Sequence, residues 1–183
     1  MSESQIVLHC APTLSGIKPG NLFSTKMNSR EELYSQISAM NEALRDKGVC
    51  VIPLRAEGGS ALIYVYRKSA LREYFKDSEV EKLLKKFGYK PESTGGCIAH
   101  LRNKIMTTQN FPHEVGLFLG YPAEDVSGFI EHHAKNFKSV GTWKVYGDAE
   151  EAQKKFDSFK TCTERYVRLH NRGVSLRQLT RAK

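Results

Sequence analysis

The segment Phe111–Pro122 constrains the fold of this chain most, because it places an apolar run between turn-forming residues. The run Val115–Leu119 is short for a helix, and it predicts a strand buried on both faces. Gly116 has no side chain to pack, which indicates close approach by another backbone, a ligand or a bulge. Gly120 and Pro122 then end this strand and begin a helix. The segment therefore predicts a central strand with polar residues at both ends.

Apolar periodicity and turn residues predict the other elements. A strand is expected within Gln5–Cys10, and a long loop over residues 11–28. Ser29 and Glu32 form the pattern of a capping box, which predicts a helix that ends at Gly48. Further strands are expected at Val49–Leu54, Ala61–Arg67 and Thr142–Tyr146, the first two joined as a hairpin. Further helices are expected from Ser69 to Gly88 with a break near Asp77, over Cys97–Thr107, after Pro122, from Asp148 to Asn171, and over Val174–Arg181.

The order of these elements predicts the fold class. The pattern strand–helix–strand occurs at residues 5–54 and again at 114–146, with a hairpin between them. Such an order predicts an α/β (α+β) protein with a mixed sheet of about five strands, helices packed on its faces, and right-handed crossovers. The length of 183 residues predicts a single globular domain over residues 1–183. A long C-terminal helix completes this fold.

Composition and cysteine usage predict a globular protein of the cytoplasm. Hydrophobic residues make up 40% of the chain and charged residues 26%, which is typical of a folded domain. The four cysteines show no paired spacing, which indicates reduced thiols. No apolar stretch approaches the ~18–20 residues of a membrane span. Met1–Gln5 lacks the features of a signal peptide.

The net charge of +8 is concentrated at the C-terminal end. Residues 165–183 form a basic segment that contains arginine and lysine but no aspartate or glutamate, whereas the rest of the chain is nearly neutral. Such a segment is typical of a solvated face or of contact with an acidic protein partner. Nucleic-acid binding is not expected, because no recognised reader motif accompanies the charge.

Several motifs resemble an uncharacterised bacterial family. They are His9–Leu14, Phe111–Pro122, Asp125–Ile130 and Trp143–Tyr146. The chain resembles the domain-of-unknown-function family numbered 3793 over almost its whole length, and Phe111–Glu114 is the most specific part of the likeness. The resemblance implies a small cytosolic protein without an established activity, and it suggests a binding or accessory module linked to metal or redox homeostasis.

Cys10 is the main candidate for bond chemistry, because it lies where the first predicted strand meets the long loop. A nucleophilic thiol needs a base, and His113 is the candidate base with Glu114 to orient it. The two residues share a sheet edge only if their strands run antiparallel. The alternative is a buried cysteine and a histidine that hydrogen-bonds the backbone. The two hypotheses differ in the pKa that they predict for the thiol, because the nucleophile of a thiol enzyme should have a depressed pKa.

Other residues are candidates for binding. His9, Tyr121, Asp125, Trp143 and Lys144 are candidate ligand-binding residues, although the Trp143–Tyr146 strand is equally consistent with core or interface packing. Cys10, His113 and Cys162 are candidate metal ligands, and Cys162 also fits the apolar stripe of its helix. No phosphate-loop or dinucleotide motif identifies a cofactor. Two functions follow: a binding or accessory module for an unknown small molecule or acidic protein, or a thiol- or metal-dependent enzyme that uses Cys10, His113 and Glu114. The sequence does not indicate the oligomeric state.

Overall fold

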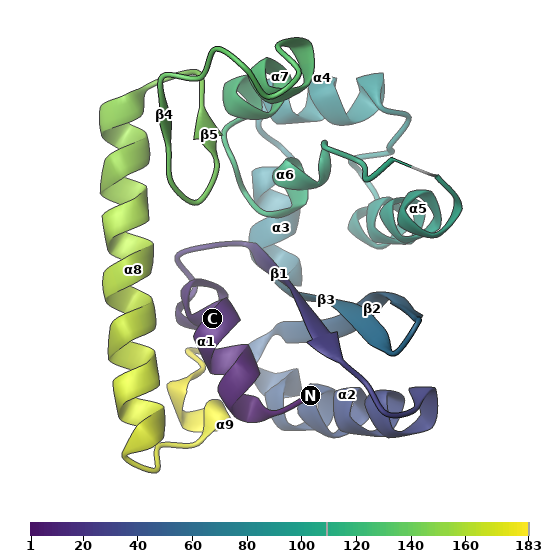
Figure 1. The fold of residues 1–183 in the computed structure, drawn as a ribbon, viewed down its shortest axis with the longest axis vertical. Helices are drawn as coiled ribbons and strands as arrows, with labels where there is room; N and C mark the ends of the chain where they lie inside the picture. Colours follow the sequence, from purple (N-terminus) through teal and green to yellow (C-terminus); the bar gives the residue numbers. More distant parts are fainter. Residues whose placement is uncertain (109, 183) are drawn as a thin grey trace. The chain divides into compact units, whose positions relative to one another are not determined.

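The structure is a computed structural model that describes residues 1–108 and 110–182. The chain divides into two compact units, here called the N-terminal unit (residues 1–70 and 161–182) and the central unit (residues 71–160). Figure 1 labels their helices and strands. Whether the chain folds as a single domain stays a prediction. Lys183, the last residue of the predicted basic segment, lies outside the described residues.

The N-terminal unit is built on a three-stranded antiparallel sheet. Its strands β1 (Gly20–Lys26), β2 (Val49–Glu57) and β3 (Ser60–Arg67) lie in the order β1-β3-β2. β2 and β3 form the predicted hairpin, with Gly58 and Gly59 at its turn. Their φ angles of 58° and 73° are those that a tight hairpin turn requires and that glycine adopts without strain. The hairpin prediction is therefore confirmed.

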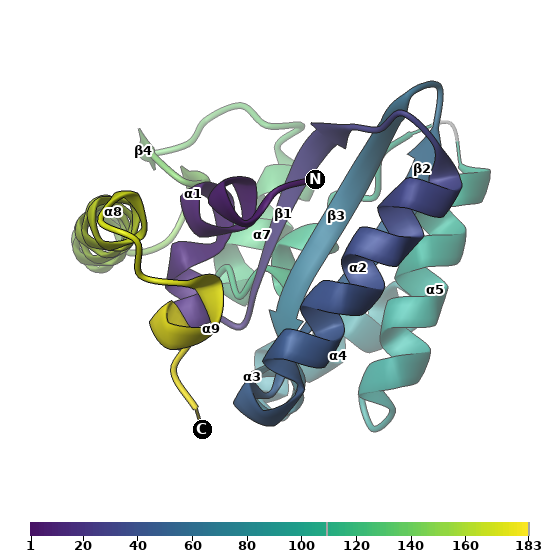
Figure 2. The same cartoon turned by 90° about the horizontal axis from the view of Figure 1, so that it is seen from below.

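Two helices cover one face of this sheet. They are α1 (Glu3–Ser15) and α2 (Arg30–Leu44), and Figure 2 shows α2 running along the sheet. Both share a core with the β3 residues Ile63 and Val65. α2 begins where the sequence predicts, since the side chain of Ser29 accepts a hydrogen bond from the backbone N–H of Glu32. A 3-10 turn, η1 (Arg45–Lys47), follows, and Gly48 ends it with a φ of 68°.

Arg67, the last residue of β3, links several segments of this unit through hydrogen bonds. Its side chain is fully buried and donates hydrogen bonds to the backbone carbonyls of Thr13 (2.6 Å), Leu14 (2.5 Å), Lys47 (3.0 Å) and Arg181 (2.8 Å). Thr13 and Leu14 lie in the last turn of α1, where the helix dipole favours a positive charge. One guanidinium thus joins the sheet, the end of α1, the loop after α2 and the C-terminal segment.

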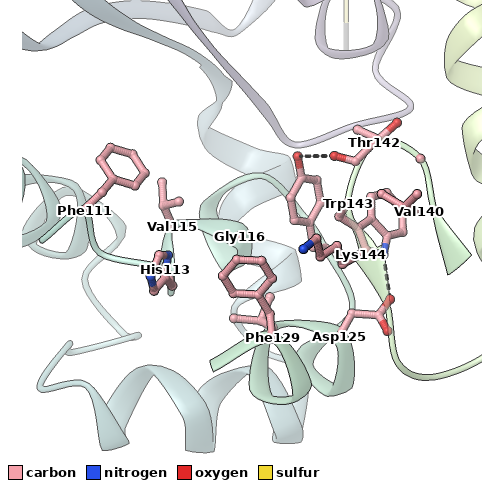
Figure 3. Close-up of a pocket in the computed structure, with 13 residues that line it drawn as sticks. Phe111, His113, Val115, Gly116, Asp125, Phe129, Val140, Thr142, Trp143 and Lys144 are labelled. Atoms are coloured by element: carbon pink, nitrogen blue, oxygen red, sulfur yellow. Dashed lines mark hydrogen bonds between the residues drawn. The ribbon is translucent and has the colours of Figure 1, made fainter. Parts of the chain in front are cut away.

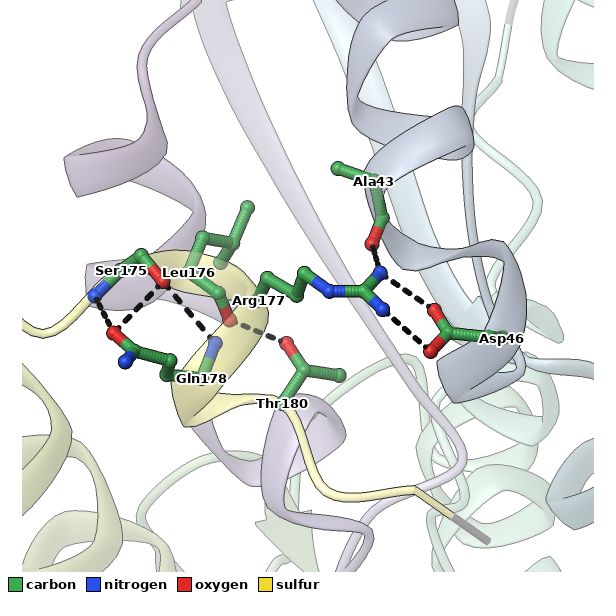
Figure 4. Close-up of polar contacts among 7 residues, drawn as sticks. All are labelled: Ala43, Asp46, Ser175, Leu176, Arg177, Gln178 and Thr180. Atoms are coloured by element: carbon green, nitrogen blue, oxygen red, sulfur yellow. Dashed lines mark hydrogen bonds and ion pairs between the residues drawn. The ribbon is translucent and has the colours of Figure 1, made fainter.

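The C-terminal segment packs into the same unit. α8 (Ala149–Asn171) ends near Gly173, and α9 (Leu176–Leu179) follows with Ser175 and Gln178 in a capping box (Figure 4). Arg177 donates to both carboxylate oxygens of Asp46, at 2.7 and 2.8 Å, and to the carbonyl of Ala43. The end of the predicted basic segment is thus bound to the N-terminal unit. Among the described helices, none combines the length and apolar character needed to cross a bilayer.

The central unit is mostly helical. Its elements after α3 (Lys68–Tyr74), which begins in the N-terminal unit, are α4 (Ser78–Lys86), α5 (Thr94–Thr107), α6 (Val115–Phe118), α7 (Ala123–Glu131), β4 (Ser139–Val140), β5 (Lys144–Val145) and the first part of α8. Phe118 packs at 5.3 Å from the rings of both Phe75 and Tyr89. A second cluster joins Trp143 and Val145 to Phe156 of α8.

The strand predicted within Gln5–Cys10 is wrong, because these residues belong to α1. Ser2 and Gln5 form a capping box that starts the helix, and its buried side chains recur at helical spacing. The β-branched run Ile6–Val7 favours a strand locally, yet packing of one helix face against the sheet determines the outcome. Pro12 lies inside α1 rather than in a loop.

The long loop predicted over residues 11–28 is also wrong, since β1 occupies Gly20–Lys26. This strand has no apolar run, and its core contact comes from Phe23, which pairs with Ile63. The prediction of one mixed sheet of about five strands is confirmed only in part. In residues 1–108 and 110–182 the five strands form two separate sheets, of three and two strands, whose neighbours are antiparallel.

The buried strand predicted at Val115–Leu119 is wrong, because Val115–Phe118 forms the short helix α6. Gly120, with a φ of 73°, ends it in a left-handed conformation. The N–H groups of Gly120 and Tyr121 donate to the carbonyls of Leu117 and Gly116, the pattern of a glycine-terminated helix. A short apolar run fits a buried strand and a buried helix equally well, so periodicity alone misassigned it. The expected second strand–helix–strand unit is therefore absent from residues 114–146, all of which are described.

Replacing Arg67 by lysine should destabilise the fold by about 3 kcal/mol or more, because lysine cannot satisfy four carbonyls that remain buried. The matched control is Arg177→Lys, where the ion pair with Asp46 is exposed and the loss should be much smaller. Urea denaturation followed by circular dichroism measures both. Equal losses in the two variants would contradict the role assigned to Arg67.

Candidate functional site

A cavity of about 350 Å³ lies in the central unit, and four aromatic side chains contribute to its largely apolar lining (Figure 3). Its walls come from the segment before α6, from α6 and α7, and from the β4–β5 hairpin. The aromatic lining residues are Phe111, Tyr121, Phe129 and Trp143, and the lining residues with charged or titratable side chains are His113, Asp125 and Lys144. Five of the predicted site residues, His113, Tyr121, Asp125, Trp143 and Lys144, thus line one cavity. Their binding of a ligand stays a prediction.

Asp125 fixes the hairpin that forms one wall. It lies in the first turn of α7 and is only 3% exposed. One carboxylate oxygen accepts from the backbone N–H groups of Tyr146 (2.7 Å) and Gly147 (2.8 Å), and the other accepts from the indole N–H of Trp143 (2.6 Å). Three N–H donors therefore hold this buried carboxylate, and its part in the site is to position the wall.

Trp143 and Tyr121 form the flat side of the cavity. Their rings stack with centroids 4.7 Å apart and planes 29° from parallel. The rings of Phe156 and Trp143 form a T-shaped contact with centroids 4.6 Å apart, within the cluster of the hairpin and α8. The hydroxyl of Tyr74 donates to the backbone carbonyl of Tyr121 and fixes its main chain. Burial raises the pKa of Tyr121 to about 12, so its hydroxyl stays neutral.

Gly116 allows close packing at this position, but against side chains rather than against the backbone, ligand or bulge that the sequence predicts. A Cβ there would lie 2.8 Å from Cγ2 of Val126 and 3.1 Å from Cδ2 of Tyr121. Both distances are shorter than ordinary van der Waals contact, so side chains, rather than a second backbone, make the close approach. α6 and α7 can therefore pack closely under the cavity only with glycine at this position.

Lys144 and His113 lie against Phe129. The ammonium of Lys144 is 6.0 Å from the centre of the Phe129 ring and 4.7 Å from that of Phe137, and it donates to the carbonyl of Ala134 at 2.8 Å. His113 meets the same Phe129 ring edge-on at 5.0 Å. Phe129 therefore lies between the two polar residues on this side of the cavity (Figure 3).

Glu114 has partners that sequence reasoning missed. The residue is 4% exposed, and its carboxylate forms an ion pair with Lys104 and accepts a hydrogen bond from the hydroxyl of Tyr89 at 3.1 Å. The Lys104 ammonium also lies 5.2 Å from the centre of the Tyr89 ring. No local pattern links these residues, which come from three separate segments. The prediction that Glu114 orients His113 therefore has no hydrogen bond to support it, and it stays a prediction.

Cys10 lies in the middle of α1 and is fully buried, not at the end of a strand. Burial raises the pKa of its thiol, and the smaller effect of the Lys18 charge lowers it. Lys18 is 3% exposed, and burial lowers its pKa to about 8. A raised thiol pKa is the opposite of what a nucleophile needs. Cys10 and His113 belong to different units, and their pairing stays a prediction.

The remaining predicted residues also lie in the N-terminal unit. His9 stacks on Phe23 with ring centroids 5.0 Å apart. The thiol of Cys162 is half-buried, donates to the hydroxyl of Ser15 at 3.3 Å, and has a pKa raised by burial. Within the described part of the chain, no group of three or more His, Cys, Asp or Glu side chains could hold a metal ion. The metal-ligand role of Cys10, His113 and Cys162 stays a prediction.

Comparison with known proteins identifies a family but no activity. A family model described as "Protein of unknown function (DUF3793)" matches residues 6–180. No curated protein and no solved structure matches the chain.

Replacing Asp125 by alanine should destabilise the protein by about 3 kcal/mol, because three N–H donors lose their acceptor. Trp143 is the only tryptophan of the chain, so its fluorescence reports the hairpin directly, and its emission should shift to longer wavelength. The control is Glu131→Ala, an exposed acid at the end of the same helix. Unchanged emission in Asp125→Ala would contradict the positioning role.

Cys10 should resist alkylation in the folded protein, since it is fully buried and its pKa is raised. We expect iodoacetamide at about pH 8.5 to modify it roughly a hundredfold more slowly than the half-buried Cys50, and at the same rate as Cys50 in urea. Peptide mass spectrometry follows each thiol separately. Fast alkylation of native Cys10 would restore the thiol-enzyme hypothesis.

Proposed function

Since the chain belongs to the family of proteins of unknown function DUF3793, whose description assigns no activity, we propose that it is a binding module that holds a small flat molecule in the cavity of its central unit. The observation that carries this proposal is the aromatic lining of a cavity of about 350 Å³. Ligand pockets of proteins fall at roughly 300–1,000 Å³ and combine apolar walls with a few placed polar groups.

The walls favour a flat ligand. The stacked pair of Tyr121 and Trp143 offers one aromatic surface, and Phe129 and Phe111 offer others. Aromatic rings prefer offset or edge-on contact with another ring, which gives flat molecules a specific attraction beyond the area that they bury. The volume lies near the lower end of the usual range, which favours a ligand with a small ring system.

The cavity is held in shape before any ligand arrives. Asp125 fixes Trp143, the hydroxyl of Tyr74 fixes the backbone of Tyr121, and Gly116 lets α6 and α7 pack closely beneath. A preformed site loses less conformational entropy on binding than a mobile one, which improves affinity without further contacts. These buried anchors support binding as the role of the cavity.

A binding role is favoured over thiol or metal chemistry. Asp125 already accepts three hydrogen bonds, and Cys10 is buried with a raised pKa. A link to metal or redox homeostasis would then act through the bound molecule rather than through a metal held by this chain. The four free cysteines fit a reducing compartment and support a place in the cytoplasm.

The neutral probe 2-naphthamide tests the proposal. Trp143 gives one indole N–H resonance, and we expect this resonance to move saturably as the probe fills the cavity. Phe129→Ala should weaken binding about tenfold, since it removes a stacking surface worth roughly 1–3 kcal/mol. Tyr34→Ala, which removes an exposed aromatic ring of the N-terminal unit, should leave binding unchanged.

Two results would contradict the binding module. One is a Trp143 resonance that does not respond to the probe at any concentration up to its solubility. The other is a response that is equal in the wild type and in Phe129→Ala, because binding would then occur elsewhere. Circular dichroism of each variant confirms that it is folded.

A further inference from the structure

We propose that the ligand carries an anionic group next to its flat ring, and that Lys144 pairs with this group. This inference rests on the proposed function and adds the chemical class of the ligand, an aromatic carboxylate or a similar ring-bearing anion. The observation behind it is a lysine on the wall of an aromatic cavity, with its ammonium near the rings of Phe129 and Phe137.

The charges that line the cavity favour an anion. Lys144 supplies a cation, and His113 adds a ring nitrogen that can donate a hydrogen bond. Asp125 is the acidic lining residue, but it is only 3% exposed, and its carboxylate already accepts hydrogen bonds from three N–H groups. It therefore offers little to a cationic ligand, whereas the lysine remains within reach.

Lys144 keeps hydrogen-bonding capacity for a ligand. An ammonium has three N–H donors, and the bond to the carbonyl of Ala134 uses one of them. The Lys144 ammonium lies 6.0 Å from the centre of the Phe129 ring and 4.7 Å from that of Phe137, and Lys144 itself is half-buried. In such surroundings an ion pair is stronger than at an open surface, and a charge-assisted hydrogen bond is about twice as strong as a neutral one.

A purely structural role is the competing explanation. Lys144 could serve only to hold the turn after α7, where His133, Ala134 and Asn136 adopt positive φ angles. Under that explanation, loss of the ammonium would affect neutral and anionic ligands equally. If Lys144 instead pairs with the ligand, loss of the ammonium would weaken the binding of anionic ligands only.

The test compares 2-naphthoate with 2-naphthamide, which have the same ring and nearly the same shape but differ in charge. We expect the wild type to bind the carboxylate roughly tenfold more tightly than the amide. The preference should narrow in 0.5 M sodium chloride, because salt screens the ion pair. Calorimetry and the Trp143 indole resonance both measure the two affinities.

In Lys144→Met the ratio of the affinities for 2-naphthoate and 2-naphthamide should fall to about one. The affinity for 2-naphthamide should stay within about twofold of the wild-type value, because methionine keeps the apolar stem and loses only the charge. Lys144→Arg should retain a preference. The matched control is Lys135→Met, an exposed lysine of the same unit that does not line the cavity, and its preference should equal that of the wild type.

The outcomes separate the two proposals. If 2-naphthamide binds as tightly as 2-naphthoate, or if Lys144→Met still prefers the carboxylate, the inference of an anionic ligand is wrong. The proposal of a binding module is not affected by either result. If neither probe moves the Trp143 resonance, the binding module itself is wrong. Should Lys144→Met fail to fold, the wild-type preference and its salt dependence still decide, because a preference that salt does not reduce overturns the ion pair.

Discussion

The central unit depends on a buried carboxylate. Asp125 places a negative charge in the first turn of α7, where the helix dipole stabilises it, and it accepts three hydrogen bonds from the β4–β5 hairpin. Strands of two residues would not stay paired without such support. The same contact orients Trp143 and thereby the stacked wall of the cavity. The stability of the hairpin and the geometry of the site therefore both depend on the hydrogen bonds of Asp125.

The N-terminal unit uses the same principle with the opposite charge. The buried Arg67 side chain donates to four backbone carbonyls, which belong to the end of α1, to η1 and to the C-terminal segment. A buried charge is costly unless it is fully hydrogen-bonded, so Arg67 and its four acceptors specify one arrangement of these segments. In both units a charged side chain at the end of an element bonds to polar groups far away in sequence.

Local signals predicted some elements and long-range contacts decided the others. Ser29, the paired glycines Gly58 and Gly59, and the break at Asp77 predicted α2, the hairpin and the start of α4, because each acts within a few residues. α1, β1 and α6 were misassigned, since their conformation depends on which face packs against a distant segment. The strand was predicted there from the short apolar run Ile6–Leu8, although the buried residues of α1 recur at helical spacing.

The site shows the same division. His113, Tyr121, Asp125, Trp143 and Lys144 stood out because they lie in or beside the motifs of the family, and the structure places all five on one cavity. Their roles did not follow from the sequence, because the partners of Asp125 lie about twenty residues further along and no spacing rule connects them. The ion pair of Lys104 and Glu114 was missed for the same reason. The apolar spacing of α5 can be recognised in the sequence, but no local pattern indicates the partner of its lysine.

The turn after α7 links backbone strain to the cavity. Histidine and asparagine tolerate a left-handed backbone better than most residues, but alanine does not, and Ala134 with a φ of 62° costs on the order of 1 kcal/mol. A turn with only a structural role could have avoided this cost with glycine. Here the strained residue directs its carbonyl to the Lys144 ammonium and fixes that charge between two aromatic rings. The strain in this turn therefore serves to position the Lys144 ammonium on the wall of the cavity.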